Sequence, residues 1–328
     1  MPGQRAIRRR VDTTVNTSPI MLLSGTSNPN LAKGISEVLG EPPCDVTIKR
    51  FADGEIFVKI DENVRGRDVF LIQSTNPPAE NMLELLCLID AAKRASAARV
   101  TAVVPYYGYG RADRKDQPRV SIAAKLMANL ITAAGADRLL SIDFHQHQIQ
   151  GFFDIPVDHL YAAPVFRRYY ETKNFENLVV VATDVSAAKM ARGYARRLGG
   201  DLAIIDKRRP AANEAEVSNI VGEVEGKNCL IPDDMIDTAG TMASTVEVLR
   251  ERGALDTYIL ATHALFSEPA VERLIKAGAK EIAVTDTVPL SPDKIEALPG
   301  LKILSVASLL AQAIESTHTN SSVSKLFK

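Results

Sequence analysis

The segment Cys229-Leu-Ile-Pro-Asp-Asp-Met-Ile-Asp-Thr-Ala-Gly-Thr241 decides the fold, because it joins an apolar strand to two adjacent acids and a turn rich in Thr and Gly. A helical run through Val246 and Leu249 follows. The first N–H groups of a helix lack partners within it, so a phosphate can bind there. Asp233 and Asp234 would repel this anion, so we expect them to meet ribose hydroxyls or a metal ion. A simple helix cap would not need a doubled acid.

Short β-branched runs alternate with helical periods after Pro19. The predicted strands are Ile20–Ser24, Val46–Phe51, Ile56–Ile60, Val69–Ser74, Val100–Val104, Leu139–Asp143, Leu178–Ala182, Leu202–Ile205, Cys229–Pro232, Tyr258–Thr262, Ile282–Thr285 and Lys302–Ser305. Several are apolar on both faces, as strands buried in a parallel sheet are. Helical spacing of apolar residues occurs between them, for example at Leu83, Leu86, Ile89 and Ala92 and at Ile122, Leu126, Leu130 and Ile131. This pattern predicts βαβ units with helices on both faces of a sheet.

The alternation of strands and helices weakens between Pro156 and Pro164 and then resumes, so we place a domain boundary there. Residues 1–18 lack an apolar pattern and are expected to be a flexible extension. Residues 19–160 and 161–328 have similar lengths and the same order of elements. We therefore predict an α/β fold with two similar doubly wound domains and mainly parallel sheets. Ligands of such sheets bind at the carboxyl ends of the strands.

Composition excludes several classes of protein. Of the 328 residues, 46% are hydrophobic and 24% are charged, which is typical of globular enzymes. A formal net charge of -1 creates no field that would attract nucleic acid or an anionic membrane. No apolar run approaches the length of a membrane span, about 20 residues. Cys44, Cys87 and Cys229 are expected to be free thiols in a reducing compartment. We expect a cytoplasmic protein with neither a nucleic-acid nor a membrane partner.

A turn with both acidic and basic residues, Arg50-Phe-Ala-Asp-Gly-Glu55, lies between two predicted strands. Phe51 is suited to stacking on a nucleobase, and Asp53 and Glu55 are suited to accepting hydrogen bonds from its amino group or from a ribose. On these residues alone, a plain hairpin turn at Asp53 and Gly54 is the simpler interpretation.

A second turn, Pro105-Tyr-Tyr-Gly-Tyr-Gly-Arg-Ala-Asp-Arg-Lys115, follows a predicted strand and is rich in cations. Arg111, Arg114 and Lys115 could neutralise a polyphosphate, and a planar guanidinium could lie against a base. A solvated basic loop is an equally good interpretation of these residues when they are taken alone.

Two more motifs have weaker meaning on their own. His145 lies just past a predicted strand, in Asp143-Phe-His-Gln-His-Gln-Ile-Gln-Gly-Phe-Phe153. A lone His at such a place is more often a structural hydrogen-bonding residue than a ligand. The basic stretch Ile205-Asp-Lys-Arg-Arg-Pro210 precedes polar residues, and a basic turn before a proline is common on surfaces.

Together these motifs resemble a known family. The segment Asp233 to Thr241 resembles the ribose-phosphate loop of the type I phosphoribosyltransferase superfamily, and the chain from about Pro19 to Phe327 resembles the ribose-phosphate diphosphokinases. The resemblance implies phosphoribosyltransferase-like folds for both domains, with ATP-binding elements in the first and the phosphate and catalytic loops in the second. The resemblance also implies that the turn from Arg50 to Glu55 contacts ATP across a subunit interface.

The resemblance also implies residue roles. The ATP-binding residues would be Phe51, Asp53, Glu55, Arg111, Asp113 and Arg114. The ribose 5-phosphate site would comprise Asp233, Asp234, Asp237, Thr238, Ala239, Gly240 and Thr241. The catalytic loop would supply Lys207 and Arg209, and His145 and Asp184 would lie at the metal. Ser322 and Ser324 correspond to a regulatory site for phosphate or ADP.

The implied reaction transfers the diphosphoryl group of ATP to the 1-hydroxyl of ribose 5-phosphate, giving 5-phosphoribosyl 1-diphosphate and AMP. The implied cofactor is Mg²⁺, and the implied assembly is a homo-oligomer, a hexamer built from dimers. Phosphoryl transfer needs alignment and cations more than covalent help from the protein, which fits this distribution of residues.

Several positions depart from the family pattern and leave alternatives open. They are Gly110, Ala112, His147, Ser186, Ala187 and Met190. The last five of these favour, to a limited degree, a catalytically weak regulatory paralogue, although Lys207, Arg209, His145 and the full acidic loop argue against it. A one-step phosphoribosyltransferase is the nearest enzymatic alternative, but it would leave Phe51 and Arg111 without a role.

Overall fold

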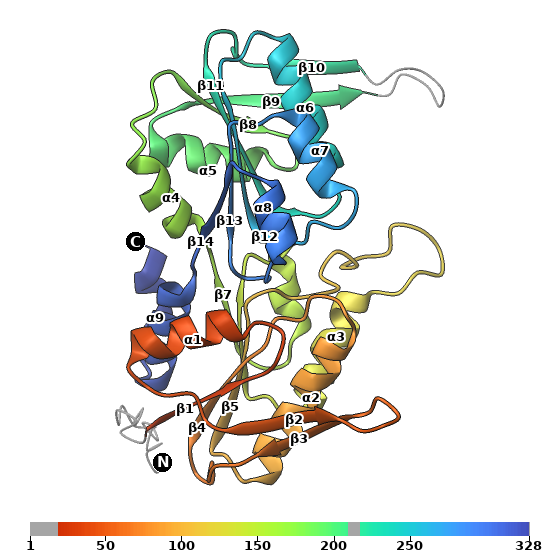
Figure 1. Ribbon diagram of the computed structural model, residues 1–328, viewed down its shortest axis with the longest axis vertical. Helices are drawn as coiled ribbons and strands as arrows, with labels where there is room; N and C mark the ends of the chain where they lie inside the picture. Colours follow the sequence, from red (N-terminus) through yellow and green to blue (C-terminus); the bar gives the residue numbers. More distant parts are fainter. Residues whose placement is uncertain (1–18, 209–216, 328) are drawn as a thin grey trace, which may run out of the picture.

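The computed structural model describes residues 19–208 and 217–327. They form two lobes, each built on a mainly parallel sheet with helices on both faces (Figure 1). The predicted α/β fold with doubly wound sheets is confirmed. The predicted extension, residues 1–18, lies outside the described residues.

The first lobe has a parallel sheet in the order β1-β4-β5-β6-β7. Its elements are β1 (Ile20–Ser24), α1 (Pro29–Leu39), β4 (Asp68–Ile72), α2 (Glu80–Arg94), β5 (Arg99–Val104), α3 (Ala123–Ala134), β6 (Arg138–Ile142), the 3₁₀ helix η1 (His147–Phe152) and β7 (Val157–Leu160). Alternate side chains of β4 point to opposite faces. Phe70 and Ile72 pack in the layer that contains α1, whereas Val69 and Leu71 pack with α2 and α3. Burial on both faces explains the continuous apolar run.

The predicted hairpin is present as an antiparallel pair, β2 (Val46–Arg50) and β3 (Ile56–Ile60). Its turn closes through hydrogen bonds from the Phe51 N–H to the Glu55 carbonyl and from the Gly54 N–H to the Phe51 carbonyl, both 2.9 Å long. Gly54 has a φ of 96°, a conformation that favours glycine. The hairpin projects sideways from the first lobe and away from the second (Figure 1).

The second lobe has a sheet in the order β10-β9-β8-β11-β12-β13-β14, in which the β9–β10 pair is antiparallel and the other pairs are parallel. Its elements are α4 (Ala163–Glu171), β8 (Leu178–Ala182), α5 (Ala188–Leu198), β9 (Asp201–Arg208), β10 (Val217–Val221), β11 (Asn228–Ile236), α6 (Gly240–Glu251), β12 (Thr257–Ala264), α7 (Ala270–Ala277), β13 (Glu281–Thr285), α8 (Pro292–Ala297) and β14 (Leu301–Leu304). Within the residues described, no helix is both long enough and apolar enough to cross a membrane.

Two strands were not predicted, and β9, β11 and β12 are longer than predicted. β7 lies where we placed the domain boundary, and β10 begins inside a stretch that looked merely polar. Both are short edge strands in which polar residues interrupt the apolar ones, so the sequence shows no sustained apolar run. β11 continues past Pro232 to Ile236, so Asp233 and Asp234 belong to the strand itself. Pairing with β12 sustains this polar end of β11.

The last helix, α9 (Ala307–His318), returns to the first lobe and packs beside α1 (Figure 1). Arg99 donates to Asp68 and to the Thr317 carbonyl, and His318 Nδ1 lies 2.8 Å from Asp68 Oδ2. The 3₁₀ helix η2 (Val323–Phe327) follows, and the Phe327 ring meets the Tyr161 ring edge-on. The division of the chain after residue 160 stays a prediction, because the end of the chain packs on the first sheet.

The two lobes meet at the carboxyl ends of their parallel strands. Ser74, after β4, donates to the Thr287 carbonyl across the junction at 2.6 Å, and Asn28 donates to the Asp286 carbonyl at 2.7 Å. Thr262 on β12 donates to the Asp143 carboxylate, which follows β6, at 2.7 Å. The residues that follow strands in both lobes are therefore brought to one place.

Candidate functional site

The centre of the candidate site is the acidic end of β11. Asp233 and Asp234 follow each other in the strand, and the Asp234 N–H donates to Asp233 Oδ1 at 2.8 Å. His145, which follows β6 in the other lobe, places Nδ1 2.8 Å from Asp234 Oδ2. The structure thus joins two residues that are far apart in the sequence and that both belong to the predicted site.

Burial and neighbouring groups shift the pKa values of the two carboxyl groups in opposite directions. Burial, reinforced by the adjacent Asp234, raises the pKa of Asp233 to about 8. Burial also acts to raise the pKa of Asp234, but hydrogen bonds from His145 and Asp233 outweigh it, so this pKa is lowered. The hydrogen bond to Asp234 in turn raises the pKa of His145. Near neutral pH the pair therefore holds one proton on Asp233 and one charge on Asp234.

The turn after β11 leads directly into helix α6. Ala239, at the start of the helix, has a φ of 58°, which is unusual for a residue other than glycine. Arg273 on α7 donates from Nη1 to the Thr238 carbonyl at 3.0 Å and so supports the turn from outside. Gly240 and Thr241 form the first turn of α6, where N–H groups and the helix dipole favour an anion.

Arg111 reaches this turn from the first lobe, where its Nη1 lies 2.6 Å from Asp237 Oδ2. Its loop is fixed by Thr75, because the Thr75 N–H donates to the Tyr106 carbonyl at 3.0 Å and the Gly108 N–H donates to Thr75 Oγ1 at 2.8 Å. A Cβ at Gly108 would lie 2.0 Å from the Thr75 carbonyl oxygen, so this close approach requires glycine.

Other predicted ATP residues lie elsewhere in the chain. Phe51, Asp53 and Glu55 are on the projecting β2–β3 hairpin, where the Phe51 side chain is half exposed and packs edge-on against the Phe57 ring. Asp53 accepts a hydrogen bond from the Glu55 N–H at 3.0 Å, within its own turn. A single chain therefore does not bring these three side chains to Asp234.

Asp113 and Arg114 lie on the same loop as Arg111. Asp113 accepts a hydrogen bond from Gln148 at 3.2 Å, and Arg114 is exposed. Asp113 also lies near His145, because its charge contributes to the raised pKa of that ring.

The predicted catalytic residues are described only in part. Lys207 is the seventh residue of β9, and its backbone pairs with Ser218 of β10. Arg209 lies outside the described residues.

Asp184 follows β8 and accepts hydrogen bonds at Oδ1 from the Ser186 hydroxyl at 2.6 Å and from the Ala187 N–H at 2.9 Å. Its charge contributes to the raised pKa of Asp233, so it lies near the acidic pair. The predicted regulatory residues Ser322 and Ser324 are exposed and belong to the segment around η2.

These side chains fit Mg²⁺ in one particular way. Among the residues described, no three or more His, Cys, Asp or Glu side chains converge as a metal cage. Mg²⁺, however, is commonly held by one or two carboxylates together with substrate phosphates and water. Asp184 and the Asp234–His145 pair suit a magnesium ion that arrives with a triphosphate.

Sequence patterns did not indicate two residues that the structure places at the site. Arg273 is one of several cations on an amphipathic helix, and its contact with Thr238 depends on how α7 packs. His263 ends an apolar strand and is 2% exposed at the junction of the lobes. In the sequence, His263 could have been found as a histidine near the carboxyl end of an apolar strand.

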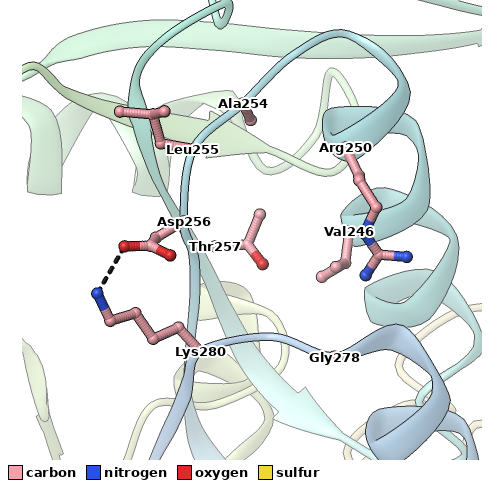
Figure 2. A pocket seen from close by; sticks show the side chains of 8 residues that line it. All are labelled: Val246, Arg250, Ala254, Leu255, Asp256, Thr257, Gly278 and Lys280. Atoms are coloured by element: carbon pink, nitrogen blue, oxygen red, sulfur yellow. Dashed lines mark hydrogen bonds and ion pairs between the residues drawn. The ribbon is translucent and has the colours of Figure 1, made fainter.

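A small pocket lies at the opposite end of the second sheet, near the start of β12 (Figure 2). Its lining residues are Val246, Arg250, Ala254, Leu255, Asp256, Thr257, Gly278 and Lys280. Lys280 and Asp256 form an exposed ion pair there, with Nζ 2.6 Å from Oδ2. The pocket is at the amino-terminal end of the strand and is separate from the acidic pair.

The fold and site define the class of this protein. A parallel strand with paired acids near its end, followed by a Thr- and Gly-rich turn at a helix start, is the arrangement expected of a phosphate loop in a type I phosphoribosyltransferase-like fold, the fold that this chain has. Residues 20–135 match the family described as the N-terminal domain of ribose phosphate pyrophosphokinase, and residues 209–328 match the phosphoribosyl synthetase-associated domain. The chain belongs to the ribose-phosphate pyrophosphokinase family.

Individual relatives agree with this assignment. The ribose-phosphate pyrophosphokinase of Chlorobaculum tepidum is 51% identical over 314 residues, which cover 94% of this chain and 95% of the relative. Ribose-phosphate pyrophosphokinase 1, chloroplastic, of Oryza sativa subsp. japonica is 52% identical over 312 residues, covering 94% and 78%. The crystal structure of phosphoribosylpyrophosphate synthetase from Mycobacterium smegmatis superimposes with a TM-score of 0.86 at 44% identity, covering 93% of this chain and 100% of that one.

Proposed function

We propose that this chain transfers the β,γ-diphosphoryl group of ATP to the 1-hydroxyl of ribose 5-phosphate. The anomeric oxygen forms a bond to the β phosphorus, the bond from that phosphorus to the oxygen of the α phosphate breaks, and the hydroxyl proton is released. The products are 5-phosphoribosyl 1-diphosphate and AMP. The observation that carries the proposal is the acidic phosphate loop of one lobe facing His145 and Arg111 of the other, in a chain of this family.

Ribose 5-phosphate binds to the second lobe in this proposal. The first turn of α6, with Thr238, Gly240 and Thr241, holds the 5-phosphate through N–H groups and hydroxyls. Asp233 and Asp234 orient the sugar. Because one carboxyl is protonated and the other is charged, the pair can both donate to and accept from ribose hydroxyls. This division orients a diol without placing two charges beside a phosphate.

ATP binds where the first lobe meets this loop. Arg111 is held by Asp237 at 2.6 Å, and an incoming triphosphate competes for the same guanidinium. Asp113 and Arg114 border the same entrance. Phe51, Asp53 and Glu55 act on the ATP of a neighbouring subunit, which explains why their hairpin projects from its own lobe (Figure 1).

Lys207 and Arg209 supply cations to the diphosphoryl group in the transition state. The backbone supports this role for Lys207, since β9 lies beside β8, which leads to Asp184, and β8 lies beside the acidic strand β11. Mg²⁺ held with the triphosphate near His145 and Asp184 would neutralise phosphate charge. The protein's own part is to align the two substrates and exclude water.

The wider setting follows from the same proposal. The assembly is a homo-oligomer, a hexamer built from dimers, and the location is the cytoplasm. Ser322 and Ser324 contribute to a regulatory site for phosphate or ADP. The projecting hairpin supports the first of these statements, because its Phe51 side chain is half exposed and accessible to a nucleotide bound by a neighbouring subunit.

The test is an assay of the purified chain with ATP, ribose 5-phosphate and Mg²⁺, with both products identified. We expect AMP and 5-phosphoribosyl 1-diphosphate in equal amounts. Lys207→Ala should lower kcat by about 10²–10³-fold with little change in either KM, because a contact of the transition state is lost. A loss expressed through KM alone would contradict the role of Lys207.

The same assay separates the alternatives. A one-step phosphoribosyltransferase would release no AMP from these substrates. A regulatory paralogue would show no turnover alone and would change the rate of an active synthetase mixed with it. The relatives above bear the name of the active enzyme, which favours turnover.

A further inference from the structure

His263 lies at the junction of the two lobes and contacts both. It is 2% exposed and sits near the carboxyl end of β12 in the second lobe. Its Nε2 lies 3.2 Å from the Ile142 carbonyl oxygen and 3.1 Å from the Asp143 carbonyl oxygen, both at the end of β6. Its Nδ1 lies 2.9 Å from Thr287 Oγ1. Every ring nitrogen is therefore engaged.

The surrounding groups determine the tautomer of this ring. Two carbonyl oxygens face Nε2, so Nε2 carries the proton and donates to them. Nδ1 then accepts from the Thr287 hydroxyl, because the Thr262 carbonyl, which also lies 3.1 Å from that hydroxyl, accepts from Thr285 at 2.6 Å. The imidazole is neutral in this arrangement, in agreement with the effect of burial, which lowers its pKa. A neutral ring with both nitrogens satisfied is a rigid connector.

His263 holds a strained part of the backbone. Asp143 has a φ of 39°, which is rare outside glycine, and its carboxylate accepts from the Ala162 N–H at 3.0 Å and from Thr262 at 2.7 Å. This turn redirects the chain after β6 so that His145, two residues later, faces Asp234. The donor at Nε2 of His263 stabilises the carbonyl within this turn.

The ring also borders the loop that carries Arg111. Its centroid lies 4.9 Å from that of Tyr106 at an interplanar angle of 65°. Tyr106 follows β5 and begins the loop that leads to Arg111. His263 therefore touches the two segments of the first lobe whose side chains pair with β11 and with the turn after it: His145 with Asp234, and Arg111 with Asp237.

We infer that His263 is a positioning residue that aligns His145 and Arg111 of the first lobe with the acidic loop of the second. The inference rests on the proposed function. Its physical basis is that a displacement of about 1 Å between catalytic groups costs on the order of 10²-fold in rate. Because His263 joins the lobes at the point where both pairs cross, its loss shifts both pairs together.

The experiment compares two buried histidines that contact opposite ends of first-sheet strands, His263 at the end of β6 and His318 at the start of β4. His263→Ala should lower kcat about 10²-fold and leave the KM for ribose 5-phosphate near the wild-type value, since the phosphate loop lies within one lobe. His263→Gln keeps a donor for the carbonyls and should recover most of kcat. His318→Ala is the matched control: His318 is 7% exposed and bonds Asp68, far from the site, so it should lower stability and leave kcat unchanged.

Two further measurements keep the test decisive if His263→Ala does not fold. Thr287→Val removes the donor to Nδ1 but leaves the ring, and a smaller fall in kcat is expected. Nitrogen NMR of labelled histidine in the wild type should report a proton on Nε2 and none on Nδ1. Wild-type kcat in His263→Ala and Thr287→Val, or the opposite tautomer, would overturn the inference. Product formation by the wild-type chain tests the proposed function separately.

Discussion

Two buried acidic regions lie at opposite ends of the parallel strands, and they are neutralised differently. Asp68 begins β4, is 2% exposed, and accepts from Arg99 and His318. Asp233 and Asp234 lie near the end of β11, where the imidazole of His145 contacts Asp234 and the Asp233 carboxyl group lies beside it in the strand. In the first region, Arg99 balances the charge of Asp68. In the second region, two carboxyl groups lie in contact with each other.

This difference shows which acidic region already has its partners within the protein and which is suited to binding a ligand. A buried carboxylate that already accepts hydrogen bonds from a guanidinium and an imidazole has no further need of a partner, so Asp68 serves to attach α9 to the first lobe. Adjacent carboxyl groups with divided protonation are costly to the fold, and such costs are typical of functional sites. We expect ligand hydroxyls or cations to complete the second region.

The largest expected effect separates the two regions by activity. Asp234→Asn should lower kcat/KM by about 10²–10³-fold, because the group that orients both the sugar and His145 loses its charge. Stability should change by less than about 1 kcal/mol, since the lost pair with His145 is offset by removal of the cost of burying the Asp234 charge. Steady-state kinetics and urea unfolding of the same preparation measure both quantities.

The same Asp-to-Asn substitution at Asp68 should lower stability and leave activity unchanged. Asp68→Asn leaves Arg99 and His318 without the charge they surround, so the free energy of unfolding should fall by about 3 kcal/mol. The folded variant should keep wild-type kcat at low temperature. Equal losses of stability in Asp68→Asn and Asp234→Asn would erase the distinction between a structural and a functional region.

The fold could largely be predicted, because buried parallel strands produce apolar runs that are visible in the sequence. β4 and β8 are examples, each buried throughout its length. The edge strands β7 and β10 were missed, since one neighbour and partial burial leave little pattern. The packing of α9 on the first lobe was not predicted either: its apolar face does not specify which sheet will cover it, and Asp68 and His318 are 250 residues apart.

The site could be predicted in parts but not assembled. The acidic loop has its own local signature, and the structure places His145 and Arg111 beside it. Their pairing partners could not be predicted, because they depend on how two sheets meet. His263 escaped notice for the same reason: in the sequence it is simply the end of an apolar strand, and its partners are backbone carbonyls, which have no sequence signature.

A smaller effect is expected in how the free energy of unfolding depends on pH, and it tests the same comparison. The pKa of Asp233 is raised to about 8, so the folded chain binds a proton that the unfolded chain releases above about pH 4. Its contribution to stability therefore falls as pH rises between those values and is constant above them. Asp233→Asn cannot ionise, so relative to it the wild type should lose about 2 kcal/mol or more across this window.

Urea unfolding of both proteins at several pH values measures this difference. His145, whose pKa is also raised, acts in the same direction: its stabilising contribution is lost as pH rises through its folded pKa. Asp234, whose pKa is lowered, acts on the acid side, where its contribution is lost as pH falls. Parallel pH profiles for wild type and Asp233→Asn would mean that the two carboxyl groups do not share a proton.

The smallest effect is expected at the exposed pair of Lys280 and Asp256, beside the pocket at the amino-terminal end of β12 (Figure 2). This pair has a short contact, like that of His145 and Asp234, but water screens it and two mobile side chains lose freedom to form it. Lys280→Ala should therefore leave the melting temperature and kcat at their wild-type values in thermal unfolding and steady-state assays. A loss comparable to that of Asp68→Asn would show that contact length, and not burial, decides which ion pairs matter in this protein.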